Sequence, residues 1–150
     1  MLAYTTLVGL FGLGIFTGAL IAVQSVLNSS LGARIGLLGS ALVLTIISMG
    51  LLLVFIVFFP RTANLRALPS FSEWYLYFGG ILGVVIIASP IFLVPKLGAA
   101  TTLTALVVGQ LTAGVIIDHF GLISAPKIEA GLLRVAGVVL ITLGAIFISK

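Results

Sequence analysis

The sequence predicts an all-α integral membrane protein of five transmembrane helices, and its composition is the first reason. Hydrophobic residues occupy 61% of the 150 positions, and charged residues occupy only 7%. A soluble domain would carry roughly 25% charged residues, whereas a lipid bilayer favours an apolar exterior. Gly is frequent in membrane helices, and it occurs 18 times in this chain.

The positions of the charges are the second reason, because they separate apolar segments of membrane-spanning length. No charge precedes Arg34, and four further uncharged stretches follow it. A helix needs about 20 residues to span the hydrocarbon core, within a range of roughly 17–25. We therefore expect a single domain over residues 1–150, with helices at about 5–27, 39–59, 73–94, 98–118 and 131–148. The last helix is long enough if Arg134 extends its guanidinium to the membrane interface.

Turn-forming residues separate these helices. The first link contains Ser29-Ser30-Leu31-Gly32 and Gly36, the second Pro60, Asn64 and Pro69, the third Pro95-Lys96-Leu97-Gly98, and the fourth Gly121 to Lys127. The second link is the longest, and its Ser70-x-x-Glu73 pattern predicts a capping box that opens the third helix. Trp74, Tyr75 and Tyr77 follow at the level of the lipid headgroups, where aromatic residues anchor helices.

The basic residues are almost evenly divided between the two membrane faces. With five helices, one face receives Arg61, Arg66, Lys127 and Arg134, and the other receives Arg34, Lys96 and Lys150. An excess of one basic residue on the first face only weakly favours a cytoplasmic N-terminus. A chain with so little bias also suits the pairing of two oppositely inserted copies, which together form an inverted repeat of the kind found in transporters.

Three amides lie within the apolar stretches and are the candidate solute-binding residues. Gln24 and Asn28 are four residues apart and therefore share one face of the first helix. Gln110 lies near the middle of the fourth helix. Amides in lipid need partners, which other helices or a hydrated cavity can supply. Two interpretations remain open: the amides hold helices together, or they line a polar path for a solute.

Asp118 and His119 close the fourth helix and are candidates for coupling or gating. Asp118 can end the helix at the interface or pair with Arg134 across the connection to the fifth helix. The alternative is a carboxylate that binds a proton or a cation. His119 is either an ordinary interfacial residue or a group that titrates in the physiological range.

Glycine spacing and one proline indicate how the helices pack. Gly14-x-x-x-Gly18 and Gly79-x-x-x-Gly83 form small-residue stripes that allow close helix approach. Pro90 removes a backbone donor within the third helix and predicts a kink, which is a further gating candidate.

Enzymatic and nucleic-acid functions find no support in the sequence. It contains no nucleophile elbow, no phosphate-binding loop and no His-x-x-x-His zinc pair. Three carboxylates, one His and no Cys leave little for acid–base chemistry or metal ligation. The basic residues do not cluster into a nucleic-acid-binding face. We therefore expect no enzyme activity, cofactor or metal, and membrane lipid and a small-molecule solute as partners.

Several motifs resemble one transporter family along nearly the whole chain. They are Gly18-x5-Gln24-x3-Asn28-x2-Leu31-Gly32, Val94-Pro95-Lys96-Leu97-Gly98-Ala99-Ala100, Gly109-Gln110-Leu111, Ile117-Asp118-His119-Phe120-Gly121-Leu122 and Arg134-x-x-Gly137. They are similar, in order and spacing, to those of the YdcZ-like family, a small branch of the drug/metabolite transporter superfamily.

The resemblance implies a multi-pass protein of the bacterial inner membrane that forms one half of a ten-helix inverted-repeat transporter. Its single five-helix chains are expected to pair as antiparallel homodimers, which agrees with the charge count. It leads us to expect a secondary transporter of small solutes that works by alternating access, with Gln24, Asn28 and Gln110 lining the cavity. A passive channel with dual topology and a non-transporting membrane subunit remain as alternatives.

Overall fold

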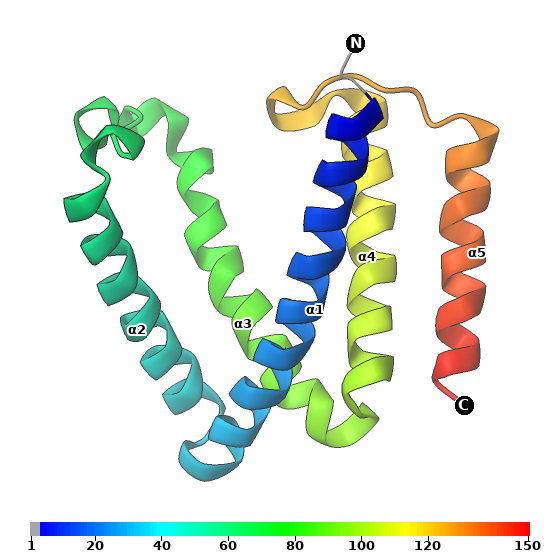
Figure 1. Ribbon diagram of the computed structural model, residues 1–150, viewed down its shortest axis with the longest axis horizontal. Helices are drawn as coiled ribbons and strands as arrows, with labels where there is room; N and C mark the ends of the chain where they lie inside the picture. The colour runs from blue at the N-terminus through cyan, green and yellow to red at the C-terminus, as the bar shows by residue number, and fades with distance from the viewer. Residues whose placement is uncertain (1–3) are drawn as a thin grey trace. The chain divides into compact units, whose positions relative to one another are not determined.

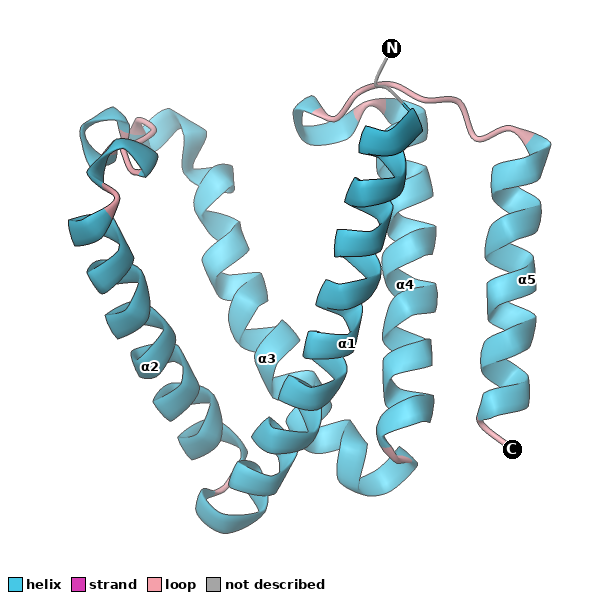
Figure 2. Cartoon of the chain, in the orientation of Figure 1, coloured by secondary structure: helices cyan, strands magenta, loops and turns pink. Residues whose placement is uncertain are grey.

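The computed structural model describes residues 4–150, which form five α-helices joined by short connections (Figures 1 and 2). The α-helices are α1 (Tyr4–Ile35), α2 (Leu37–Phe58), α3 (Phe78–Leu97), α4 (Ala99–Phe120) and α5 (Leu132–Ile148). Shorter 3₁₀ helices are η1 (Pro60–Thr62), η2 (Leu65–Ala67), η3 (Phe71–Tyr77) and η4 (Leu122–Ser124). The predicted all-helical architecture is therefore present.

Four of the helical segments are long and apolar enough to cross a membrane. They are Val8–Ile35, Leu37–Phe58, Phe71–Leu97 and Ala99–Phe120. The fifth helix, α5, is apolar but has only 17 residues. At 1.5 Å per residue it is about 25 Å long, which is shorter than a hydrocarbon core of about 30 Å.

The helices fall into two compact units, Met1–Phe92 and Leu93–Lys150. In the first unit α1 packs against α2, and η1–η3 lead on to α3. In the second unit α4 packs against α5, and the chain between them includes η4 (Figure 1). Two buried hydrophobic residues are found among the described side chains, Ala41 and Ile91.

The first helix is longer than the sequence predicts, because Ser29-Ser30-Leu31-Gly32 does not form a turn. α1 runs through these residues to Ile35. The helix stops at Gly36, whose φ of 81° is a conformation that glycine adopts without a steric penalty. Of the turn-forming residues in the first link, Gly36 therefore marks the corner, whereas Ser29 to Gly32 remain helical.

The third helix also begins differently, because residues 71–77 form the 3₁₀ helix η3 rather than the first turns of an α-helix. The predicted capping box is absent: Ser70 makes no side-chain cap, and its Oγ lies 2.7 Å from Ser72 Oγ. Glu73 has φ −102° and ψ 27°, outside helical values, so the chain bends at this residue. The regular helix starts at Phe78.

The α1–α2 and α3–α4 corners share one local geometry. Gly36 and Gly98 have nearly the same backbone angles, φ 81° and 78° with ψ 163° in both, and each precedes the first residue of a helix. Four residues after each glycine stands a fully buried hydroxyl residue, Ser40 or Thr102. The match indicates an internal repeat of the corner at an interval of 62 residues.

Candidate functional site

Four buried polar residues gather in the first unit where α1 meets the start of α2. Ser25, Asn28 and Ser29 are 3%, 7% and 7% exposed, and Ser40 of α2 is fully buried. The three α1 residues are spaced at i, i+3 and i+4, so they share one helix face. We call these four residues the α1–α2 polar cluster.

Hydrogen bonds fix two of the three hydroxyls of this cluster, those of Ser25 and Ser40, but not its amide. Ser40 Oγ donates to the Asn28 carbonyl oxygen at 3.1 Å, across the two helices. Ser25 Oγ donates to the Ile21 carbonyl at 2.8 Å, within α1. Within residues 4–150, the side-chain amide of Asn28 has no hydrogen-bond partner. The amide atoms of Asn28 are not among the fully buried unpartnered atoms of the described residues, so they keep some accessible surface and can be hydrogen-bonded from outside these residues.

Apolar and small residues of α3 border this cluster. A Cβ built on Gly32 would overlap Ile91 Cγ2 and would lie 3.8 Å from Ser40 Cβ, so α1, α2 and α3 meet at this glycine. Pro90 and Ile91 are both buried. Pro90 has no N–H, which leaves the Ile86 carbonyl without its regular α-helical donor. α3 nevertheless continues through Pro90 to Leu97.

The other two predicted amides are exposed on their helices. Gln24 lies on α1, one turn before Asn28, and Gln110 lies on α4 in the second unit. Neither side chain has a hydrogen-bond partner among the described residues. In a bilayer, an exposed amide must find a partner outside its own helix, because hydrocarbon offers none.

The glycine stripes predicted to pack helices face open space in this chain. No described atom outside the local helix lies within 4 Å of a Cβ built at Gly14, Gly18, Gly79 or Gly83. Their role in helix packing therefore stays a prediction, and it would require a partner surface other than the described helices of this chain. Gly32, which sequence reasoning placed in a turn, is the closely packed glycine of α1.

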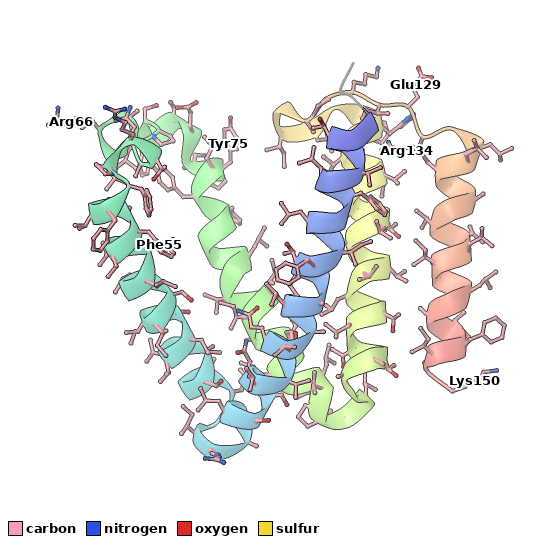
Figure 3. All side chains as sticks on the ribbon, viewed as in Figure 1. Phe55, Arg66, Tyr75, Glu129, Arg134 and Lys150 are labelled. Carbon is pink, nitrogen blue, oxygen red and sulfur yellow. The ribbon has the colours of Figure 1, made fainter. Side chains whose placement is uncertain are left out.

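Asp118 holds the α4–α5 connection in two ways. Its Oδ2 accepts a hydrogen bond from Arg134 Nη2 at 2.8 Å, and the two side chains are 29% and 37% exposed. Its backbone carbonyl accepts the Ile128 N–H at 2.9 Å. Gly121, in the left-handed conformation with φ 62°, caps α4. Of the alternatives for Asp118, the ion pair with Arg134 is the one present, and Figure 3 shows Arg134 at this end of α5.

His119 holds the same connection through its ring. The Ala130 N–H donates to His119 Nδ1 at 3.2 Å, so Nδ1 carries no proton in this arrangement. The ring also lies edge-on to Phe120, with centroids 4.8 Å apart. His119 is therefore a structural acceptor for the connection, whatever further role it has.

Sequence reasoning missed the hydroxyl residues, namely Ser25, Ser29, Ser40 and Thr102. Thr102 is fully buried, and its Oγ1 is the buried side-chain atom without a hydrogen-bond partner in the described part of the chain. Two signals in the sequence could have indicated them. Ser25, Asn28, Ser29 and Gly32 follow helical spacing, and Ser40 and Thr102 each follow a corner glycine by four residues.

No group of three or more metal-ligating side chains gathers among the residues searched in this structure. The polar cluster is instead neutral, small and hydrogen-bonding, which suits a solute rather than a metal ion.

Residues 9–147 match the family model described as "Putative inner membrane exporter, YdcZ". The chain belongs to this family. The match covers the five helices almost completely and includes both the α1–α2 polar cluster and the α4–α5 connection. A comparison with curated proteins and one with solved structures found no match.

Membership in the YdcZ family confirms the resemblance that the motifs indicated, and it classes the chain as a multi-pass inner-membrane transporter. The family is described as exporters and not as enzymes.

Proposed function

We propose that the chain is one half of a small-solute exporter, which works as a homodimer by alternating access. Two copies supply ten helices, and solute binds at a polar site to which each copy contributes Asn28. The observation that carries the proposal is the side-chain amide of Asn28, a residue only 7% exposed, which forms no hydrogen bond within residues 4–150 and lies on the α1 face that also carries Ser25 and Ser29. An apolar helix would tolerate such a group only if a solute, water or another chain satisfied it.

The exposed amides support the presence of a second copy in the transporter. Gln24 and Gln110 are exposed on helices that otherwise present apolar side chains. Facing lipid, each would lose its hydrogen bonds, whereas a partner surface or a hydrated path restores them. Gln24 therefore extends the Asn28 face of α1, and Gln110 provides a polar position on α4. We place both along the solute path.

We propose an antiparallel arrangement of the two copies. The four-to-three division of basic residues gives one chain little reason to prefer a single orientation. The chain contains no cysteine, so Leu68→Cys in the α2–α3 connection is a unique label. Labelling of this residue by an impermeant maleimide from both sides of the membrane supports the antiparallel dimer, and labelling from one side only contradicts it.

In this proposal, Asp118, His119 and Pro90 take part in the movements that open and close the solute path. The ion pair with Arg134 engages Oδ2 of Asp118, so opening of the α4–α5 connection would free this oxygen to bind a cation. Pro90 lies in the part of α3 that meets Gly32, where a helix with a missing hydrogen bond bends more readily.

The proposal is tested by flux through the purified chain in proteoliposomes, under a proton gradient and then under a membrane potential, across a broad solute screen. Once a transported solute is found, we expect Asn28→Leu to abolish its flux, because Leu fills the position without hydrogen-bonding groups. The matched control is Thr17→Val on the same helix. Thr17 Oγ1 donates to the Leu13 carbonyl of its own helix, so this variant also replaces a polar side chain of α1 by an apolar one but leaves the cluster intact.

Two results would argue against the proposal. The first is the absence of flux for the wild-type chain throughout the screen. The second is equal flux for Asn28→Leu and Thr17→Val in proteins with the same helical circular dichroism, which would assign Asn28 to packing alone.

A further inference from the structure

The connection between α2 and α3, residues 59–77, is a folded segment rather than an extended loop. It contains η1, η2 and η3 in succession (Figure 1). Thr62 Oγ1 donates to the Phe59 carbonyl at 2.7 Å, and the Tyr77 hydroxyl donates to the Pro69 carbonyl at 2.9 Å. The second bond joins two residues eight positions apart and so closes the connection on itself. Its side chains are therefore presented by a defined backbone.

Large apolar side chains cover this connection, whose residues 59–70 lie between two candidate membrane spans and whose residues 71–77 begin the second of them. Phe71 is 93% exposed, the highest value among the exposed large hydrophobic residues described. Others exposed in the same segment are Phe59, Leu65, Leu68, Trp74, Tyr75, Leu76 and Tyr77. Loops in water are normally polar, so this surface indicates contact with a less polar medium.

Two arginines accompany the apolar side chains. Arg61 lies in η1 and Arg66 in η2, while Glu73 is the one acidic residue between positions 59 and 77. Figure 3 shows Arg66 and Tyr75 at the same end of the first unit, beyond the helices that they connect. Because the candidate spans are Leu37–Phe58 and Phe71–Leu97, residues 59–70 lie at the membrane surface and residues 71–77 lie where the second span enters the membrane.

We propose that residues 59–77 form a binding surface for anionic phospholipid headgroups. Arg61 and Arg66 bind the phosphates, and Phe71 and Trp74 insert below them among the upper acyl groups. Aromatic rings are favoured at this depth, and arginine matches phosphate geometry through paired N–H donors. The surface has both an apolar part and a net positive charge, which is the combination that an anionic lipid surface requires.

The single tryptophan of the chain makes this proposal directly measurable. Trp74 lies within the connection, so all tryptophan fluorescence reports on it. The full chain is reconstituted in vesicles in which either phosphatidylglycerol or phosphatidylcholine carries bromine on its acyl chains, at equal mole fraction. Bromine quenches tryptophan only at short range. We expect brominated phosphatidylglycerol to quench Trp74 more strongly, with a binding preference of roughly five-fold for each arginine.

Two further measurements isolate the arginines. In Arg61→Gln/Arg66→Gln the preference for phosphatidylglycerol should disappear, while Arg34→Gln/Lys150→Gln, which removes the same charge at the other membrane face, should retain it. In the wild-type chain, raised salt should reduce the preference, since salt screens charges near the surface.

Three results would overturn the proposal. Equal quenching by the two brominated lipids in the wild-type chain means that the surface does not select anionic headgroups. A preference that survives in Arg61→Gln/Arg66→Gln means that other groups bind the lipid. Quenching of Trp74 by aqueous acrylamide but not by brominated lipid means that the segment faces water or a protein partner instead of the bilayer.

Discussion

Replacement of Gly32 by alanine is the sharpest test of how the first unit is packed. Gly32 lies on α1 opposite α3, and a Cβ at this position would overlap Ile91 Cγ2. Ile91 is 5% exposed. It has little room to turn away, because a β-branched side chain in a helix has one strongly preferred rotamer. The added methyl group must therefore push the two helices apart or strain the isoleucine.

The magnitude follows from comparison with Gly12→Ala on the same helix, where nothing lies within 4 Å of the new Cβ. Both variants gain the same intrinsic helix propensity, so this contribution cancels between them. What remains is the cost of overpacking, about 1–3 kcal/mol. We expect Gly32→Ala to be less stable than Gly12→Ala by that amount.

The assay is reversible unfolding of the purified chain in mixed micelles, with Trp74 fluorescence and circular dichroism as readouts. Ile91→Ala in the Gly32→Ala background completes a double-mutant cycle. Removal of Cγ2 creates room for the new methyl group, so the double variant should be more stable than the sum of the single effects predicts. Equal stability of Gly32→Ala and Gly12→Ala, or strict additivity in the cycle, would refute the packing described for α1 and α3.

Three further predictions concern the hydrogen bonds of the two units. Asp118→Asn and Arg134→Gln should show a coupling of about 0.2–1 kcal/mol in a double-mutant cycle, because the pair is partly exposed; zero coupling would contradict a stabilising pair. Ser40→Ala should lower the free energy of unfolding by about 1 kcal/mol through loss of its interhelical bond, and an unchanged value would argue against that bond. A leucine at position 119 cannot accept the Ala130 N–H. Exchange of the Ala130 amide should therefore be faster in His119→Leu than in the wild-type chain at the same pH, and unchanged exchange would exclude this role.

The helix scheme could be predicted because its signals are local. Apolar length and the positions of charged residues are properties of the sequence alone, and they placed α2, α4 and α5 within a few residues of their observed bounds. The end of α1 was wrong because Ser29 and Gly32 are turn-forming types in water. Here Ser29 is buried and Gly32 allows α3 to approach, so packing keeps the helix intact.

The polar cluster could be predicted only in part. Asn28 was identified because an amide in an apolar stretch is conspicuous. The serines around it were missed, since small hydroxyl residues are ordinary in membrane helices and often bond to their own backbone, as Ser25 does. Only the packing of α1 against α2 distinguishes Ser40, which bonds across the helices.

The ion pair between Asp118 and Arg134 was predicted from the sequence, but only as one of several alternatives for Asp118. The two residues are 16 positions apart across a single connection, which is close enough for contact. The sequence could not select this alternative, because the path of the connection depends on the left-handed conformation at Gly121 and on the Ile128 N–H bond.

The central proposal, a homodimeric exporter in which both copies contribute Asn28, is tested most directly by mixing. Wild-type chains and Asn28→Leu chains are reconstituted together in varied ratio, and solute flux is measured. In a dimer that needs both amides, an equal mixture leaves only about one quarter of the dimers fully wild type, so flux should fall well below half. A fall to half would mean that each copy works alone, and an unchanged flux would mean that Asn28 lies outside the path; either result would contradict the account.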